Sequence, residues 1–381
     1  MPPPNNSLDR PLGQSIGPRP AARKRISWGG LVLGLTGIVL FVSSGAIALR
    51  DRPFRTPPPI ASAEPPAATP TAAEAAPVKP VGDGPQIIKV DPEAPRPADN
   101  VVIVRDPSAI GQNLRVAHLP DKALIEDSET GPLPIRAADG RRPFDVYARP
   151  WSGARGARVA IVIGGLGVSQ TGTQEAVRKL PPEVTLAFAS GGNSLGRWMQ
   201  AARQKGHEIV MQVPLEPYDY PNVDPGRNTL TVAASSRENL AALRWALSRI
   251  TNYTGVMNYM GARFSADPSA MAPVMDELAK RGLLYLDDGS SARSIAPELA
   301  MKAGVPFAVG DTAIDAVRER GDILNKLDEL ERIARAKGFA IGIGAAFDVT
   351  VDAVASWVQE AKKRGIEIVS VSAIASDPER G

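Results

Sequence analysis

The chain of 381 residues contains no cysteine and only two histidines, His118 and His207. Without cysteine, neither a disulfide framework nor a thiolate metal site can form. A catalytic zinc site usually takes three protein ligands from histidine, cysteine, aspartate or glutamate. Two histidines far apart in the sequence cannot provide most of such a ligand set. We expect His118 to be a packed loop residue beside Pro120, and His207 to be a capping or packing residue at the start of a strand.

The sequence also lacks a concentrated charge of one sign. Its formal net charge is +3, and no run of lysine or arginine is interleaved with aromatic residues. A nucleic-acid surface needs clustered cations, and a single-strand groove adds aromatic side chains on which bases stack. The composition therefore predicts no nucleic-acid partner.

One long uncharged segment, residues 31–49, lies near the start of the chain. Its length is close to the ~20 apolar residues that cross a hydrocarbon core of ~30 Å. Basic residues dominate residues 1–30, which places this end in the cytoplasm and the remainder across the membrane. A cleaved signal peptide would have an apolar region of about 7–15 residues with a small-residue site close behind, whereas Ala61–Ala63 lies well beyond it. We predict a single-pass inner-membrane protein whose C-terminal domain is periplasmic.

Two segments separate this predicted anchor from the main domain. Residues 50–100 are rich in proline and alanine, and they cannot bury enough apolar surface to offset the entropy of ordering. We predict a disordered linker there, extended by its prolines. Residues 101–157 are expected to form an extended segment that packs on the domain. Its part from 131 to 150 is expected to be irregular, with Tyr147 and Trp151 as anchors.

Short apolar, β-branched runs recur through residues 158–374 and alternate with segments of helical periodicity. Near-continuous apolar runs indicate parallel strands covered on both faces. The helices have clear boundaries: Ser235 and Glu238 match a capping box, Asp267-Pro268 begins a second helix, and Gly282 ends it. The pattern predicts a distorted (β/α)7–8 barrel, with an open doubly wound sheet as the alternative. In both folds, ligands collect at the carboxyl ends of the strands. The runs expected as strands are 159–163, 184–188, 209–213, 255–258, 283–286, 306–309, 339–343 and 366–371.

Polar residues follow several of these predicted strands and are our candidates for ligand binding. The Gly-Gly-Leu-Gly turn after the first strand lacks the G-x-G-x-x-G spacing of dinucleotide sites, so it more simply permits a tight turn. We expect the candidates to converge at one end of the sheet, with Arg263 pairing with a carboxylate. Asp287 and Asp288 are adjacent, so only one of them is expected to face the barrel mouth. Such groups suit sugar hydroxyls, and they equally suit a structural hydrogen-bond network. The candidates are Gln212, Glu216, Asn258, Tyr259, Arg263 and Asp287.

The order and spacing of many motifs, among them IVIGGLG, GHEIVMQVPLEPYDYP, GRNTL, GVMNYMGARF and ARSIAP, resemble the divergent polysaccharide deacetylase family from about Arg158 to Ser372. The resemblance implies the deformed barrel of polysaccharide deacetylases, a glycan substrate, and removal of acetyl groups assisted by a divalent metal such as zinc. Glu216, Asn258, Gly261, Arg263 and Asp287 match the family's pattern.

The family's pattern also places an aspartate pair where this chain has Gly164 and Gly165. It places histidines where this chain has Gln212, Tyr259 and Ala345. Each departure removes a group that a hydrolytic metal site would use. We therefore expect no bound metal, no other cofactor and no catalytic residue in this chain.

Three functions remain open on this reading. The first is a non-catalytic protein that binds a cell-envelope glycan, or an envelope protein, through the carboxyl ends of its strands. The second is an active carbohydrate deacetylase or hydrolase whose unusual metal is held by carboxylates such as Glu216 and Asp287. The third is a structural scaffold of the envelope.

Overall fold

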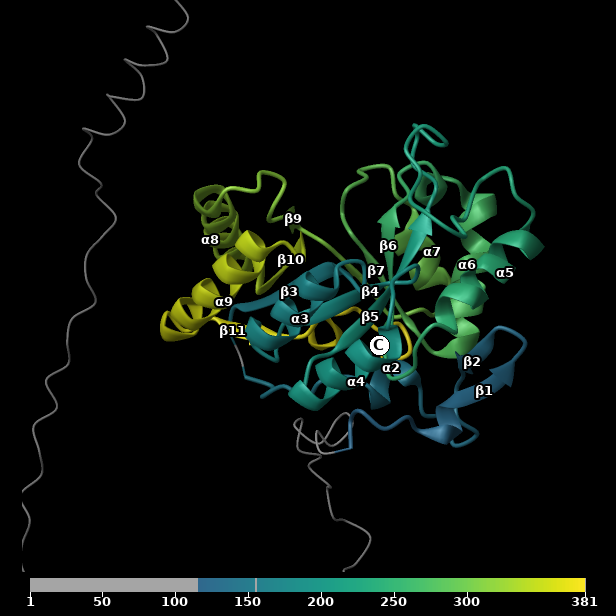
Figure 1. The fold of residues 1–381 in the computed structure, drawn as a ribbon, viewed down its shortest axis with the longest axis horizontal. Helices are drawn as coiled ribbons and strands as arrows, with labels where there is room; N and C mark the ends of the chain where they lie inside the picture. Colours follow the sequence, from purple (N-terminus) through teal and green to yellow (C-terminus); the bar gives the residue numbers. More distant parts are fainter. Residues whose placement is uncertain (1–115, 155, 381) are drawn as a thin grey trace, which may run out of the picture. The chain divides into compact units, whose positions relative to one another are not determined.

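The structure, a computed structural model, describes residues 116–154 and 156–380. In this part of the chain, a parallel sheet curls into a half-barrel with helices on its outside (Figure 1). The strands of this sheet are β3 (Arg158–Leu166), β4 (Thr185–Ala189), β5 (Ile209–Leu215), β6 (Gly255–Met260), β7 (Leu284–Asp287), β8 (Phe307–Val309), β9 (Thr312–Ala313), β10 (Phe339–Ala345) and β11 (Glu367–Val369). The helices are α3 (Gln170–Lys179), α4 (Leu195–Lys205), α5 (Ser236–Leu247), α6 (Pro268–Arg281), α7 (Ala296–Ala303), α8 (Arg320–Lys337) and α9 (Asp348–Lys363), with short 3-10 turns η3 (Phe264–Ala266) and η4 (Val371–Ala373).

The strand order is β8-β7-β6-β5-β4-β3-β10-β9, and β11 pairs with the beginning of β3. The two outermost strands, β8 and β9, are separated in the chain only by Gly310 and Asp311. Because β8 pairs with β7 and β9 pairs with β10, the segment 307–313 joins the two ends of the curled sheet. The sequence-based prediction of a parallel, barrel-like α/β domain is confirmed in this form, and each of the eight runs expected as strands overlaps one of the observed strands.

Alternate residues of each strand pack into two separate cores, as the two-residue period of a strand requires. Ile161, Ile163 and Phe188 face the helices and pack with residues such as Leu243 and Trp357. Their neighbours in sequence point into the curled sheet, where small and medium side chains fill the interior. These interior residues include Ala160, Val162, Ala187, Val210, Met257, Leu286 and Ile341. The interior is therefore packed, and ligand access is limited to its ends.

The predicted helix boundaries are confirmed. Oγ of Ser235 accepts a hydrogen bond from the Glu238 amide, and the Glu238 carboxylate accepts one from the Ser235 amide, which completes the capping box of α5. Asp267 caps α6 by accepting from the amides of Ser269 and Ala270. Gly282 ends α6 at φ +68°, a left-handed conformation that favours glycine.

We call the end of the sheet at which the parallel strands begin the amino face. Residues 116–151 cover this end. They contain η2 (Lys122–Leu124), a hairpin of β1 (Ile125–Ser128) and β2 (Gly131–Pro134), and the short helix α2 (Pro143–Val146). The prediction that residues 131–150 are irregular is therefore wrong for β2 and α2. Tyr147 is a buried anchor as expected, and its hydroxyl accepts a hydrogen bond from the Asp121 amide (3.1 Å). Trp151 packs against the interior core and carries the Arg158 guanidinium over its ring.

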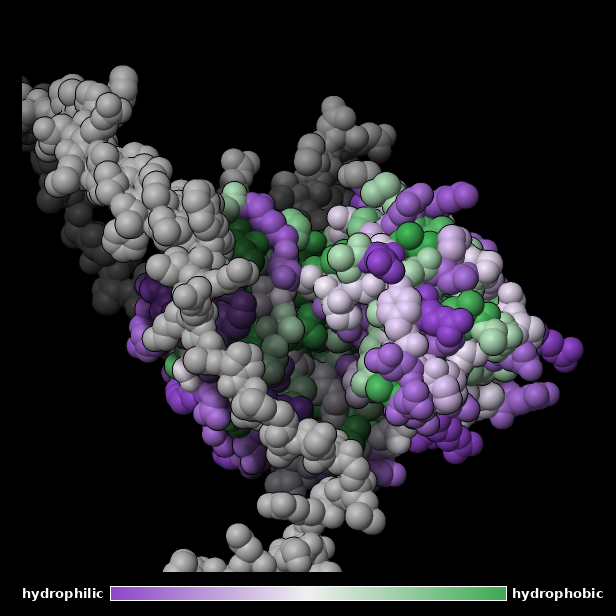
Figure 2. All heavy atoms as spheres, turned by 90° about the horizontal axis from the view of Figure 1, so that it is seen from above, coloured by the Kyte–Doolittle hydropathy of each residue, from purple (hydrophilic) through white to green (hydrophobic). Residues whose placement is uncertain are grey.

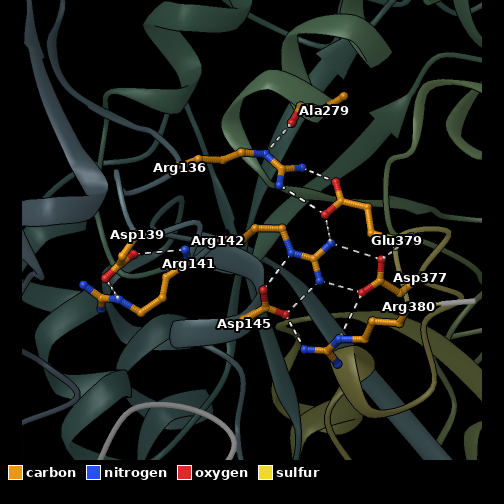
Figure 3. Close-up of polar contacts among 9 residues, drawn as sticks. All are labelled: Arg136, Asp139, Arg141, Arg142, Asp145, Ala279, Asp377, Glu379 and Arg380. Carbon is orange, nitrogen blue, oxygen red and sulfur yellow. Dashed lines mark hydrogen bonds and ion pairs between the residues drawn. The ribbon is translucent and has the colours of Figure 1, made fainter.

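Ion pairs join this segment to the C-terminal tail on the amino face (Figure 3). The buried guanidinium of Arg142 contacts Asp145 (2.7 Å) and Asp377 (2.5 Å). Arg136 pairs with Glu379, and Arg380 pairs with Asp145. The segment before β3 and the tail after β11 are thus held to one another as well as to the sheet.

The predicted anchor at residues 31–49 and the linker at 50–100 lie outside the described residues. Of the helices within residues 116–154 and 156–380, none combines the length and the apolar character that a membrane span requires.

Candidate functional site

The loops that follow the carboxyl ends of the parallel strands form the end of the domain opposite the amino face, and we call this end the carboxyl face. Strands β6 and β7 point towards it at the top of Figure 1. Figure 2 looks down from that side and shows a hollow in the molecule, with apolar residues among those around it. The amino face is covered by residues 116–151, so the carboxyl face is where ligands of a parallel α/β sheet are expected.

Gly164 and Gln212 lie against each other inside this end of the sheet. A Cβ atom on Gly164 would stand 2.7 Å from Nε2 of Gln212, so the glutamine amide fills the space of a side chain at position 164. Oε1 of Gln212 accepts a hydrogen bond from the Gly165 amide (2.7 Å). Gly165 itself adopts φ +75°, which disfavours residues with a side chain. Gln212, the first of the ligand-binding candidates, thus fills the end of the sheet interior and is hydrogen-bonded to β3.

Two further positions of the family's metal pattern lie at the same end. Ala345, the last residue of β10, pairs in register with Gly164 of β3. Tyr259 lies opposite Pro214 in the pairing of β5 with β6, and therefore on the same sheet face as Gln212, two residues away. Tyr259 is 43% exposed. Tyr259 is available to a ligand, whereas Ala345 offers no polar side chain.

Glu216 and Arg263 form the ion pair that was expected at this end. Nη1 of Arg263 lies 2.9 Å from Oε1 of Glu216, and the Glu216 side chain is 5% exposed against 49% for Arg263. The other carboxylate oxygen of Glu216 accepts from the Val232 amide (2.5 Å). Glu216 therefore holds two loops together, and the outer part of the Arg263 guanidinium faces solvent.

Asn258 and Asp287 are buried and satisfied by local hydrogen bonds. Asn258 donates to the Met260 carbonyl (2.8 Å) and accepts from the Asp288 amide (2.8 Å). Asp287 accepts from the hydroxyl of Ser294 (2.5 Å) and from the Gly289 amide (2.9 Å). Burial raises the pKa of the Asp287 carboxyl, and these two donors act in the opposite direction.

Asp287 shares its sheet face with Tyr285, which belongs to the helix-facing core, so Asp287 points towards the helix layer. Asp288 is the partly exposed member of the pair, and its carboxylate accepts from Ser290. The ligand candidates thus divide into a solvent-facing set, Tyr259 and Arg263, and a set that braces the loops, Gln212, Glu216, Asn258 and Asp287.

These residues do not fit the divalent metal of a polysaccharide deacetylase. Residues 116–154 and 156–380 contain no group of three histidine, cysteine, aspartate or glutamate side chains arranged to hold a metal ion. His207 lies at the start of β5, on the amino face, with Nδ1 2.9 Å from the Val184 carbonyl oxygen. Burial lowers the pKa of His207 to about 4, so the ring is a neutral packing group, as predicted.

Large apolar side chains that remain exposed in the described part of the chain gather on the carboxyl face. Seven of the ten belong to loops or residues at the strand ends, so the two ends of the sheet differ in surface chemistry. The sequence alone does not reveal this gathering, because exposure depends on which helices cover each strand. The seven are Val168, Tyr218, Val223, Tyr259, Val309, Val317 and Phe347. Phe347 also carries the Arg318 guanidinium 3.8 Å from its ring centre.

The connection between β5 and α5 projects from the carboxyl face as a loop with closed ends. The Glu216 amide donates to the Leu230 carbonyl (2.9 Å), and the Leu230 amide donates to the Pro214 carbonyl (3.0 Å). We call residues 217–229 the arm. Tyr218 and Val223 on the arm are 52% and 40% exposed. Loops whose ends are held together on a rigid scaffold, and which carry an exposed aromatic side chain, are typical of binding sites.

Comparison with known proteins places this geometry in a family. The sequence profile described as "Divergent polysaccharide deacetylase" matches residues 161–375. The crystal structure of the uncharacterized protein ATU2773 from Agrobacterium tumefaciens C58 is similar, with a TM-score of 0.63 and 56% identity, covering 64% of this chain and 99% of that one.

Two curated proteins are also similar. An uncharacterized protein of Haemophilus influenzae is 25% identical over 187 residues, which are 49% of this chain and 66% of that protein. The uncharacterized protein YibQ of Escherichia coli is 24% identical over 222 residues, 58% of this chain and 68% of that protein. The chain thus spans about two thirds of the length of these two relatives.

Proposed function

We propose that the chain, which belongs to the divergent polysaccharide deacetylase family, binds a glycan of the cell envelope at its carboxyl face and does not hydrolyse it. We further propose that it is a single-pass inner-membrane protein, anchored through residues 31–49, with this domain in the periplasm. The uncharged length of that segment and the basic residues before it support the anchor.

The packing of Gln212 on Gly164 is the observation that carries the non-catalytic part of the proposal. Metal-assisted hydrolysis needs a bound ion that lowers the pKa of water from 15.7 to about 7. At the position of the first expected aspartate, a side chain would meet the Gln212 amide at 2.7 Å. A glutamine that hydrogen-bonds the Gly165 amide replaces one expected histidine, and Ala345 replaces another. These substitutions remove the ligands and also fill part of the space in which an ion would bind.

The side chains left at the surface support a carbohydrate ligand. Tyr218 and Tyr259 present large amphipathic rings at the ends of neighbouring strands β5 and β6. Such rings contribute apolar contact area together with a hydroxyl group. The half-exposed Arg263 adds several hydrogen-bond donors. Sugar rings, which carry both C–H faces and hydroxyl groups, suit this combination.

The test uses the purified full-length chain in detergent and a linear, N-acetylated glucosamine tetramer. We expect saturable binding by calorimetry, weakened in Tyr218→Ala and Tyr259→Ala. Met301→Ala, which removes an exposed apolar side chain from α7, is the matched control and leaves binding unchanged. We expect no acetate release with or without added Zn²⁺. Chelator-sensitive acetate release would overturn the non-catalytic proposal, and no binding to this or other envelope glycans would leave the scaffold function.

A further inference from the structure

The arm is held to helix α5 at two separate points. Where the chain returns from the arm, Asn239 of α5 both accepts from the Thr231 amide (3.0 Å) and donates to the Thr231 carbonyl (2.9 Å). Within the arm, the Arg227 guanidinium lies over the ring of Trp245, 5.2 Å from its centre. A stacked cation on tryptophan contributes about 0.5–1 kcal/mol at exposed sites.

The same tryptophan ring also contacts a residue that holds a second loop of the carboxyl face. The Arg249 guanidinium lies 5.3 Å from the Trp245 ring centre. Its Nε donates to the Ser190 carbonyl (3.1 Å), and its Nη2 lies 3.4 Å from the Gly192 carbonyl oxygen. Residues 190–192 belong to the loop between β4 and α4, next to the strand from which the arm rises.

We propose that Trp245 is a positioning residue of the carboxyl face: its ring fixes the arm and the β4–α4 loop relative to each other through Arg227 and Arg249. The ring is partly buried and packs against the helix-facing core, so it is itself held by the domain. When a binding loop is already ordered in the free protein, ligand binding carries a smaller entropic cost for ordering it. The consequence for ligand affinity rests on the proposed glycan-binding function, whereas the consequence for loop order does not.

Each of the three residues has its own expected effect on loop order, measured by amide hydrogen exchange on the full-length chain without ligand. Arg227→Gln is expected to speed exchange in peptides covering 217–229 only. Arg249→Gln is expected to speed exchange in peptides covering 190–194 only. Trp245→Leu, which keeps an apolar side chain in the core, is expected to speed exchange in both, and Trp245→Phe to restore much of the protection.

A matched control is available on the neighbouring helix. Arg197 stacks on Trp198 at 4.3 Å, a contact of the same type on α4. Arg197→Gln is expected to leave exchange in the arm unchanged. If Trp245→Leu leaves the arm as protected as in the parent chain, the inference is overturned, whatever the protein binds.

Affinity for the N-acetylglucosamine tetramer then links loop order to the site. We expect Trp245→Leu and Arg227→Gln to weaken binding about two- to fivefold, the change that a contact of ~0.5–1 kcal/mol corresponds to. Faster arm exchange with unchanged affinity would overturn the role of Trp245 in the binding site. Faster arm exchange in a chain that binds no glycan would support the positioning role and refute the proposed function instead.

Discussion

The two ends of the curled sheet use polar groups in opposite ways. On the amino face, Arg142 and Glu208 are buried and matched: Arg142 by the carboxylates of Asp145, Asp377 and Glu379, and Glu208 by Ser372 and the Arg149 amide. On the carboxyl face, Glu216 is buried while its partner Arg263 is half exposed, and the tyrosines of the rim reach solvent. The first pattern stabilises a closed structure, and the second leaves groups available to a ligand. Substitutions on the amino face should therefore change mainly stability, whereas substitutions of the exposed residues on the carboxyl face should change mainly binding.

The largest expected loss of stability follows from removing the buried cation Arg142 on the amino face. Arg142→Met would remove the buried partner of Asp145 and Asp377 and leave them only Arg380, whose side chain is 52% exposed (Figure 3). Removing one member of a buried pair typically costs about 3–5 kcal/mol, so we expect a loss of this order in the free energy of unfolding. Chemical denaturation measures it. The neighbouring Arg141→Met is the control, because Arg141 is 43% exposed where it pairs with Asp121 and Asp139, and such pairs contribute only ~0–1 kcal/mol. Equal losses in the two variants would refute the contrast.

The next effect is a pH dependence that originates at His207. Burial lowers the pKa of this imidazole to about 4, while the unfolded chain takes up a proton near pH 6.5. The stability that depends on the neutral ring is therefore fully present above about pH 6.5 and is lost as the pH falls towards 4. The difference amounts to about 3 kcal/mol across that range. Unfolding free energies of the parent chain and His207→Gln, measured from pH 7 to pH 4, should converge as the pH falls. Parallel curves would contradict the assignment.

A smaller effect is expected where two residues share one space on the carboxyl face. Gly164→Ala should cost about 1–3 kcal/mol of stability, because its Cβ atom would meet the Gln212 amide. In a Gln212→Ala background the same change should cost much less, which a double-mutant cycle measures as coupling. Gly191→Ala, where a Cβ atom meets no atom within 4 Å, provides the control. Additive costs at 164 and 212 would show that the two positions do not compete.

The smallest effect on stability is expected at the rim of the carboxyl face. Tyr218 is 52% exposed, so Tyr218→Ala should change the free energy of unfolding by no more than ~0.5 kcal/mol. The same substitution at Tyr147, 2% exposed on the amino face, should cost several times more because it creates a cavity of aromatic size. Thermal unfolding of the two variants is the measurement. A large loss at Tyr218 would assign the arm a structural role.

The helix boundaries could be predicted from the sequence, because helix caps depend on residues that are close together in the chain. The Ser235–Glu238 box and the stop at Gly282 depend on residues close in sequence, and both lie where expected. The β1–β2 hairpin was missed because Pro132 and Pro134 interrupt one of its strands and its turn, Glu129-Thr130, lacks the usual glycine or asparagine. The alternation rule separated Asp287 from Asp288, but the prediction that Asp287 faces the barrel mouth is wrong, because Asp287 shares its sheet face with Tyr285 and points towards the helix layer.

The contacts that define the candidate site could not be read from the sequence for a different reason. Gln212 and Gly164 are 48 residues apart by their numbers, and their contact depends on the curvature of the sheet between β3 and β5. Arg227 and Trp245 meet because the arm folds back on α5, which no periodicity encodes. The resemblance to a deacetylase family drew attention to position 164, but only the folded structure shows that the Gln212 amide occupies the space of a side chain there.

The join between β8 and β9 also affects how the domain behaves beside other copies of itself. An open strand edge presents unpaired amides and carbonyls on which a foreign strand can add. In the described part of the chain, the outermost strands of the large sheet are only three and two residues long. Phe307 of β8 exchanges both backbone hydrogen bonds with Ser376 of the tail (2.8 Å each), so its outer side is already occupied. The outermost strands of this sheet thus offer only a short template for edge-to-edge pairing, and the C-terminal tail covers part of the β8 edge.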